Sequence, residues 1–231
     1  MNWHKQIKIL KRILSVMKDI SLKTIYFNLK YLPFHQAVYL PIFLSRHVYL
    51  MNMKGKIVIE GPVKSKQIKI GFKGVGIFDH KRSRSILNIF GDLVFCGEAF
   101  IGHGSKISIG KEGKIIFGNN FRMSAESSLA SRKGITFGDN CLVSWDTLII
   151  DTDYHKIYDE DGKQLNENRE ILIGNNVWIG CRCLILKGAK IPSGCVIGAN
   201  SVVNARELSG ENKIFGGQPV KELKNNITWE N

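Results

Sequence analysis

Residues 171–203 read ILIGNNVWIGCRCLILKGAKIPSGCVIGANSVV, a stretch with regularly spaced aliphatic side chains. An aliphatic side chain recurs in it at every sixth position, namely Ile173, Ile179, Ile185, Ile191, Ile197 and Val203. Small or modest side chains stand two residues before most of these positions, at Val177, Cys183, Ala189, Cys195 and Ser201. A period of six matches neither an amphipathic helix nor the simple alternation of an isolated strand. The pattern therefore indicates a structural repeat.

A parallel β-solenoid accounts for this repeat. In such a fold, short strands joined by tight corners stack like positions about 4.8 Å apart. The recurring aliphatic residue fills the interior, and glycine accepts corner dihedrals that a β-carbon resists. Weaker sixfold phases begin at Ile89 and resume, after slips, at Phe117 and Phe137. Small insertions at corners would produce such slips, so we expect the solenoid to run from about residue 55 to about residue 205.

The repeat is interrupted once for a long stretch. The sixfold phase ends at Ile149 and returns at Ile171. Residues 156–170 between them are polar and charged, and Asp161 with Gly162 marks a turn. We expect these residues to form a loop that leaves the solenoid.

The five cysteines are an odd number, and three of them follow the repeat. Cys141, Cys183 and Cys195 occupy the small-residue position before an interior aliphatic residue, which favours core packing in a reducing compartment over disulfide bonding. Cys181 and Cys183 form a CRC pair without a second cluster. We therefore expect no zinc site and no metal requirement.

The formal net charge of +13 is distributed unevenly. Residues 1–84 contain 17 Lys and Arg against 3 Asp and Glu, whereas residues 85–231 contain 16 against 17. The whole positive excess therefore lies in the first third of the chain.

That first third has two competing interpretations. Residues 4–18 have the spacing of a short basic amphipathic helix, and residues 22–50 are rich in Leu, Ile, Tyr and Phe. The longest uncharged run, residues 31–45, is shorter than the roughly 20 apolar residues of a membrane-spanning helix. Residues 1–50 either contact an anionic membrane surface or form a helical cap on the open strand edges of the solenoid, and the two are compatible. No base-reading motif accompanies the charge, so we expect no nucleic-acid partner.

The six consecutive repeats resemble the hexapeptide-repeat acyltransferases. The resemblance implies an all-β chain, a left-handed parallel β-helix of roughly eight coils at about 18 residues each. We expect a basic, mainly helical N-terminal segment at residues 1–54, the catalytic β-helix at 55–205, and a tail at 206–231 with a short C-terminal helix folded back on the last coils.

The stretch SWDTLIIDTDYH, residues 144–155, resembles the galactoside, maltose and capsular polysaccharide O-acetyltransferase branch of that family. Trp178 follows His155 by 23 residues, in the spacing of that branch. The resemblance implies that His155 is the general base and that Trp178 lines the cleft for coenzyme A and acceptor. Trp178 also precedes an interior residue, Ile179, so its indole should point outward. A large exposed indole is more typical of a binding surface than of packing.

Three further residues are candidates because they lie close to His155 in the sequence. Asp153 is assigned to the catalytic group, where it would orient the imidazole, bind sugar hydroxyls or cap the loop. Asp151 and Trp145 are candidate acceptor contacts, and Trp145 has packing on the solenoid wall as its alternative. No cysteine or serine stands where a covalent nucleophile would be expected.

The family resemblance also implies the donor site. Acetyl-CoA would lie along a solenoid corner, bonding backbone groups at Gly180 and Ala199. Its phosphates would meet Lys221 and Lys224, where the family often has Arg in place of Lys224. A lysine keeps the charge and loses the bidentate geometry of an arginine.

The expected function is acetyl-CoA-dependent O-acetylation of a sugar hydroxyl in surface polysaccharide biosynthesis. The family implies a homotrimer with active sites between subunits, and we expect a cytoplasmic protein that can associate with the inner face of the membrane. Residues 121–128, FRMSAESS, lack the acceptor-pocket Asn of the small-sugar enzymes, so the acceptor can differ from a simple galactoside. Three alternatives remain: N-acetylation of an amino sugar, a zinc enzyme using His80, His103 and His155, and a non-catalytic binding module.

Overall fold

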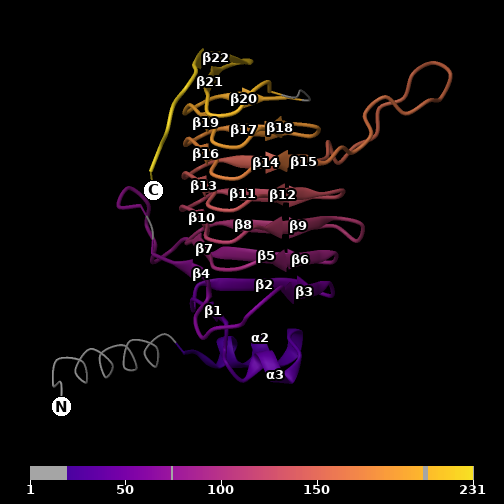
Figure 1. Ribbon diagram of the computed structural model, residues 1–231. Helices are drawn as coiled ribbons and strands as arrows, with labels where there is room; N and C mark the ends of the chain where they lie inside the picture. Colours follow the sequence, from indigo (N-terminus) through magenta and orange to yellow (C-terminus); the bar gives the residue numbers. More distant parts are fainter. Residues whose placement is uncertain (1–19, 74, 205–207, 231) are drawn as a thin grey trace.

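The computed structural model describes residues 20–73, 75–204 and 208–230, and in them the chain forms a three-sided parallel β-helix (Figure 1). Each of the first six coils contributes one strand to each of three sheets, which we call A, B and C. The coils stack along one axis, so that neighbouring strands in a sheet come from consecutive coils (Figure 1).

The strands of each sheet are as follows. Sheet A contains β1 (Ile42–Leu44), β4 (Ile68–Phe72), β7 (Ala99–Gly102), β10 (Phe121–Met123), β13 (Leu142–Val143), β16 (Trp178–Ile179), β19 (Val196–Ile197), β21 (Ile214–Gly217) and β22 (Val220–Lys224). Sheet B contains β2 (Val48–Met53), β5 (Ser85–Ile89), β8 (Lys106–Ile109), β11 (Ser128–Ser131), β14 (Leu148–Ile150), β17 (Leu184–Leu186) and β20 (Val202–Val203). Sheet C contains β3 (Lys56–Ile59), β6 (Asp92–Phe95), β9 (Lys114–Phe117), β12 (Ile135–Phe137), β15 (Ile171–Ile173) and β18 (Lys190–Ile191).

The sixfold positions form the interior, as the sequence predicts. All six aliphatic residues of the repeat and all five small residues before them are buried. The register stacks Ile149 on Ile185 in sheet B and Ile179 on Ile197 in sheet A. One interior column is aromatic, because Phe117 stacks between Phe95 and Phe137 at centroid distances of 5.4 and 5.6 Å.

The β-helix begins earlier than the sequence pattern indicates. The expected boundary near residue 55 is wrong, because β1 already pairs in parallel with β4 and β2 with β5. The first coil therefore starts at Ile42. Its strands have neither the glycines nor the clear sixfold spacing of the later coils, so the repeat is not visible there.

Two helices cover the open edge of this first coil. Helix α2 (Leu22–Tyr31) is capped by Ser21, whose hydroxyl accepts from the Thr24 amide, and α3 (Phe34–Ala37) follows it. The Asn28 side chain bonds both the carbonyl and the amide of Ile42, at 2.7 and 3.1 Å. The Thr24 hydroxyl accepts from the Leu44 amide at 3.1 Å. These side chains take the place of a neighbouring strand, so α2 and α3 form a cap on the first coil. The basic helix expected at residues 4–18 lies outside the described residues.

The C-terminal tail is a hairpin and not the expected short helix. Strand β21 adds to β19 in parallel, and β22 folds back on β21 in antiparallel pairing. The turn holds Gly217 at a φ of 104°, a conformation that suits glycine, followed by Pro219 after a cis peptide bond. The open edge of the last coil thus offers main-chain partners that outweigh the helical propensity of the tail.

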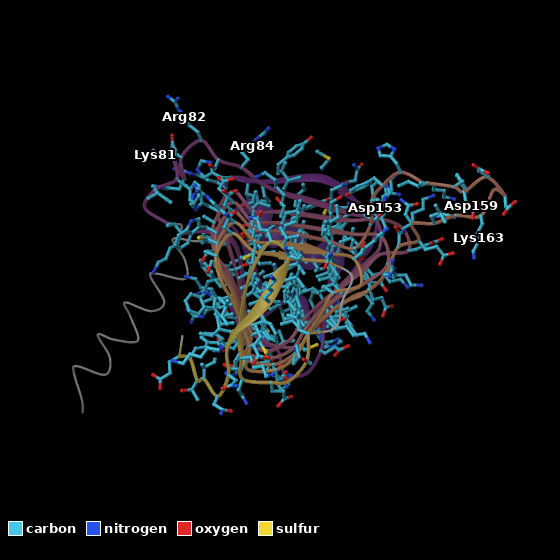
Figure 2. The ribbon with its side chains drawn as sticks, turned by 90° about the horizontal axis from the view of Figure 1, so that it is seen from above. Lys81, Arg82, Arg84, Asp153, Asp159 and Lys163 are labelled. Carbon is cyan, nitrogen blue, oxygen red and sulfur yellow. The ribbon has the colours of Figure 1, made fainter. Side chains whose placement is uncertain are left out.

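Two long segments leave the stack, one at the corner between sheets A and B and one at the corner between sheets B and C. Residues 151–170 connect sheet B to sheet C and protrude far from the solenoid (Figure 1). Residues 75–84, which precede β5, belong to the second excursion, between sheets A and B. Figure 2 shows Lys81, Arg82 and Arg84 of this second excursion at one corner, and Asp159 and Lys163 of the first loop at another. Residues 156–170, which the sequence predicts to be a loop, lie in the first excursion.

Helices long and apolar enough to cross a bilayer are absent from the described part of the chain.

The capping role of Asn28 gives a stability prediction. Replacing Asn28 with Ala leaves the buried amide and carbonyl of Ile42 without their partner, and each such group costs about 1–3 kcal/mol. We expect the free energy of unfolding in urea to fall by about 2–3 kcal/mol. Gln36→Ala serves as the control, because the Gln36 amide makes only a 3.4 Å contact with the Ile59 carbonyl among the described residues. Equal stability of the two variants would contradict the capping role.

Candidate active site

His155 lies at the base of the protruding loop, directly after the last strand of sheet B in its coil. Its imidazole is exposed and makes no hydrogen bond within the part of the chain that the structure describes. Its backbone is held, because its amide donates to the Asp153 carbonyl and its carbonyl accepts from Asn166 at 2.7 Å. The backbone of His155 is thus held in place, while its imidazole is exposed to solvent.

A polar network ties the two ends of the loop to the next coil. The Asp153 carboxylate pairs with the Lys187 ammonium and accepts from the Asn166 amide at 2.8 Å. Lys187 also donates to the Asn166 carbonyl at 3.1 Å, and the Asn166 side chain accepts from the Ile157 amide. Asp153 therefore anchors the loop and does not bond the imidazole of His155, so it is better described as a positioning residue.

The charge of Lys187 affects the titration of this anchor. The hydrogen-bonded ammonium holds the pKa of Asp153 below its usual range, and the Asn166 amide acts in the same direction. Because the folded pKa is the lower one, the stabilisation from this pair is complete above the ordinary aspartate pKa of about 3.9. It is lost as the pH falls through the lowered pKa, so the anchor persists throughout the neutral range.

Asp151 is not available to an acceptor. It is completely buried, and its oxygens accept from the Ser131 hydroxyl and from three successive amides, those of Arg132, Lys133 and Gly134. A carboxylate with these partners stabilises the corner between sheets B and C. The expectation that Asp151 contacts the acceptor is therefore corrected: the residue holds the base of the loop from inside.

Trp178 points outward from β16, as the sequence predicts, with 38% of its surface exposed. Its indole nitrogen donates to the Ser144 hydroxyl at 3.0 Å, which fixes the ring against the preceding coil. Trp229 of the tail lies beside it at a centroid distance of 6.0 Å, and donates to the Asn176 carbonyl at 2.8 Å. The result is an aromatic surface on the outer face of sheet A.

Trp145 lies at the corner between sheets A and B, in the coil below Trp178. Its side chain is half-buried, and its carbonyl accepts from the Arg182 amide of the next coil. The adjacent Asp146 forms an ion pair with Arg182 at 3.4 Å. This position fits both wall packing and a contact with a substrate that lies along the corner.

The same corner contains the expected donor contacts. Gly180 is buried; its amide donates to the Ile197 carbonyl and its carbonyl accepts from the Thr147 hydroxyl. A β-carbon on Gly180 would lie 2.7 Å from the Ala199 nitrogen, so close coil contact requires the glycine. The amides of Cys181 and Ala199 make no hydrogen bond within the described residues, and they stand on consecutive coils. The available donors at this corner are thus Cys181 and Ala199, and not Gly180.

Lys221 and Lys224 are exposed on β22, at the far end of the sheet that carries Trp178. Three strand spacings separate β22 from β16, which is about 14 Å. Cations at this distance from an exposed indole suit a ligand that is long and ends in phosphates.

The structure divides the candidate residues between two corners. Trp178 lies on sheet A, while Trp145, Cys181 and Ala199 lie where sheet A turns into sheet B. His155 lies beyond the other edge of sheet B. Within one chain, His155 is therefore not adjacent to the corner between sheets A and B.

The described residues contain no group of three or more His, Cys, Asp or Glu side chains that could hold a metal ion. All five cysteines are free, and none of them bonds another. Burial raises the pKa of Cys141 to about 11 and also raises that of Cys183 and Cys195, so these thiols stay protonated and unreactive. Their role is to fill the interior of the corners.

Comparisons with known proteins agree with this architecture. The family described as bacterial transferase hexapeptide (six repeats) matches residues 170–205. An "uncharacterized 24.8 kDa protein in cps region" of Klebsiella pneumoniae is 32% identical in an alignment 193 residues long, which covers 79% of this chain and 85% of that protein. The putative lipopolysaccharide biosynthesis O-acetyl transferase WbbJ of Escherichia coli is 30% identical over 138 residues, 55% of this chain and 69% of the relative.

A solved structure, that of the polysialic acid-specific acetyltransferase NeuO, has the same fold. It superposes with a TM-score of 0.53 at 24% sequence identity, over 81% of this chain and 90% of that one. The fold, the repeat and the relatives together define an acyltransferase. The chain belongs to the bacterial hexapeptide-repeat transferase family, which confirms the left-handed β-helix expected from the sequence.

Asn166 and Lys187, which hold the loop, were not predicted from the sequence. Asn166 is one of several polar residues in the loop, and Lys187 follows a repeat position without departing from the pattern. The sequence contains no spacing that would join them to Asp153.

The network predicts that Lys187 keeps the loop in place. In Lys187→Met the carboxylate of Asp153 loses its cation, so we expect the pKa of Asp153 to rise towards its usual value. We also expect limited proteolysis at neutral pH to cut within residues 156–165 several times faster than in the wild type. Lys163→Met, at the loop tip (Figure 2), is the control and should leave the cleavage rate unchanged. Equal rates for Lys187→Met and the wild type would show that the pair does not hold the loop.

Proposed function

We propose that this protein transfers an acetyl group from acetyl-CoA to a hydroxyl of a surface polysaccharide or its precursor. The observation that carries the proposal is the exposed, unbonded imidazole of His155, held by its backbone at the base of the loop. The relatives support the reaction class, because WbbJ is named for lipopolysaccharide biosynthesis and NeuO for acetylation of polysialic acid.

The proposed mechanism is direct transfer. The neutral imidazole of His155 takes the proton of the sugar hydroxyl as its oxygen forms a bond with the thioester carbon. The carbonyl electrons move to oxygen, and a backbone amide such as that of Cys181 stabilises the oxyanion. The carbonyl then re-forms, the carbon–sulfur bond breaks, and the imidazolium returns its proton to the thiolate of coenzyme A. The buried, protonated cysteines of the core take no part.

The corner between sheets A and B supports donor binding. Acetyl-CoA would lie along this corner, with its amide-rich arm beside Cys181 and Ala199 and against Trp178. Its phosphates would reach Lys221 and Lys224 on β22. Lys213 is less suitable, because it already pairs with Glu222 at 2.7 Å. Trp145 is the candidate contact for the acceptor at the same corner.

The separation of His155 from this corner supports a homotrimer. In a threefold arrangement, each subunit can present the base of its protruding loop to the donor corner of the next subunit. The active site would then contain His155 of one chain and Trp178 of its neighbour.

Acetylation of an amine on an amino sugar is the alternative, since the same base serves both acceptors. Matched hydroxy and amino sugars in a coenzyme A release assay would separate the two reactions. The described residues do not favour the amine.

Replacing His155 tests the proposed chemistry. In His155→Ala we expect acceptor-dependent release of coenzyme A to fall by about 10²-fold or more, the usual contribution of a general base. Binding of acetyl-CoA, measured by calorimetry, should remain within about twofold of the wild type, because its proposed contacts are the corner amides, Trp178 and the lysines of β22, and not the imidazole. Release is measured with a panel of acidic and neutral oligosaccharides.

His35→Ala is the matched control, because His35 is also exposed but lies on α3, in the N-terminal cap. It should keep full activity. Wild-type activity in His155→Ala would remove His155 from the mechanism. Absence of release with every acceptor, together with absence of acetyl-CoA binding, would remove the proposed function.

The N-terminal cap supports a further part of the proposal, contact with an anionic membrane. Its outward face exposes several apolar side chains, namely Leu22, Tyr26, Leu29, Phe34, Val38 and Tyr39. Exposed apolar and aromatic side chains beside basic residues are typical of interfacial anchors. Lys23 is not among the free cations, because it bonds the carbonyls of Arg46 and Val48.

Co-sedimentation with vesicles checks this contact. We expect the full chain to sediment with vesicles that contain phosphatidylserine, and the variant Leu29→Glu with Phe34→Glu to bind several times more weakly. Leu165→Glu, a change at an equally exposed apolar residue of the distant loop, is the control. Equal sedimentation of all three proteins would exclude the cap as the membrane contact.

A further inference from the structure

A basic groove lies on the outer face of sheet A, below the aromatic surface at Trp178. It has a volume of about 720 Å³ and extends over β4, β7 and β10. Four cationic residues line it, against one acidic residue, Glu98. The cations are Lys66, Lys69, Lys73 and Arg122. Three of them come from the first third of the chain, where the sequence concentrates its positive charge.

The strand register connects this groove to the candidate active site. Lys69 pairs with Phe100, Phe100 with Arg122, Arg122 with Leu142, and Leu142 with Trp178. These five residues therefore form one outward column on consecutive coils. At about 4.8 Å per strand, the column extends about 19 Å from Lys69 to Trp178.

The two cations of the column, Lys69 and Arg122, form no ion pair that would stabilise the fold within the described residues. Some of the described basic side chains have acidic partners, as in the pairs of Lys106 with Glu126 and Lys187 with Asp153. Lys69 and Arg122 form no ion pair among the described residues. They carry like charges two strands apart, with only Phe100 between them. Such an arrangement raises the energy of the empty groove, and an anionic ligand would lower it.

Phe100 adds a second element of recognition. Its ring is partly exposed between the two cations. Aromatic rings accept the apolar face of a sugar, while cations bind carboxylate or phosphate groups. A column that alternates cation, aromatic ring and cation fits a chain in which acidic groups alternate with ring faces.

We propose that the groove binds a segment of an acidic polysaccharide, with carboxylates or phosphates on Lys69 and Arg122 and a sugar ring on Phe100. The column then directs the chain towards Trp178, where a hydroxyl further along it would be acetylated. This inference rests on the proposed function for its purpose, but binding in the groove does not depend on turnover.

The test measures binding of fluorescent polymers to the full-length protein by anisotropy at low salt. Polysialic acid is the carboxylate probe, a teichoic acid is the phosphate probe, and dextran of equal length is the neutral control. We expect at least one acidic polymer to bind, with an affinity that falls as salt is added, and dextran not to bind. In the double variant Lys69→Glu with Arg122→Glu, the dissociation constant should rise by about tenfold.

Lys114→Glu is the matched control, because Lys114 is exposed on sheet C in the same coil as Phe100. It should change the dissociation constant by less than about twofold. Acetyl-CoA binding should be unchanged in all variants, which shows that they are folded. A selective rise in KM for the acidic acceptor, with kcat retained, would place the groove in acceptor binding.

Equal affinity of the wild type and the double variant, or failure of both acidic polymers to bind the wild type, would overturn the proposal. So would tighter, groove-dependent binding of phosphatidylserine vesicles or of an oligonucleotide. Groove-dependent polymer binding without any acetyl transfer would support the groove while removing the proposed function.

Discussion

Consecutive coils stack strand on strand in a fixed register in all three sheets. Each coil must place an apolar side chain at the same three interior positions, because parallel strands about 4.8 Å apart leave no room for a polar or misplaced one. The stack of Ile149 on Ile185 and of Ile179 on Ile197 shows this register directly. A solenoid gains stability from contacts between neighbouring coils, so the two ends lack a neighbour. The cap by Asn28 and Thr24 at one end and the β21–β22 hairpin at the other follow from that requirement.

The same constraint decides where function can be added. Strands cannot change without breaking the register, whereas a corner can accept an insertion of any length. The chain uses this freedom at residues 151–170, and it holds the base of the insertion with two carboxylates. Asp151 binds three amides from inside, and Asp153 pairs with Lys187 from outside. His155 follows directly after them, so its backbone is fixed although its imidazole is open. These two carboxylates hold the residues on either side of His155, while the loop beyond them protrudes from the solenoid.

The sequence predicted those features that repeat or that break a repeat. The interior column was predictable because each of its positions recurs six residues later, and the loop was predictable because the phase stops at Ile149. The first coil was not, because β1 and β2 lack the glycines that mark later corners. The sequence of the tail predicts a short helix. In the structure the tail pairs instead with the open edge of β19, because these main-chain hydrogen bonds outweigh the local helix propensity. Asn166 and Lys187 lie 13 and 34 residues from Asp153, and only the fold brings them together.

The outward side chains of sheet A recur with the same period as the interior ones, but they differ in chemical type from coil to coil. Interior positions are uniform because they fill one cavity, whereas the outward column changes from Lys69 through Phe100 and Arg122 to Trp178. Because β-sheet register places these side chains in a straight line at a constant spacing, a polymer can contact several of them without bending. Each exposed contact contributes little by itself, but contacts that are engaged together raise the effective concentration of the polymer at the next one. A solenoid can thus serve a polymeric ligand, because the stacking that builds its core also aligns outward side chains into the column that we propose as a binding track.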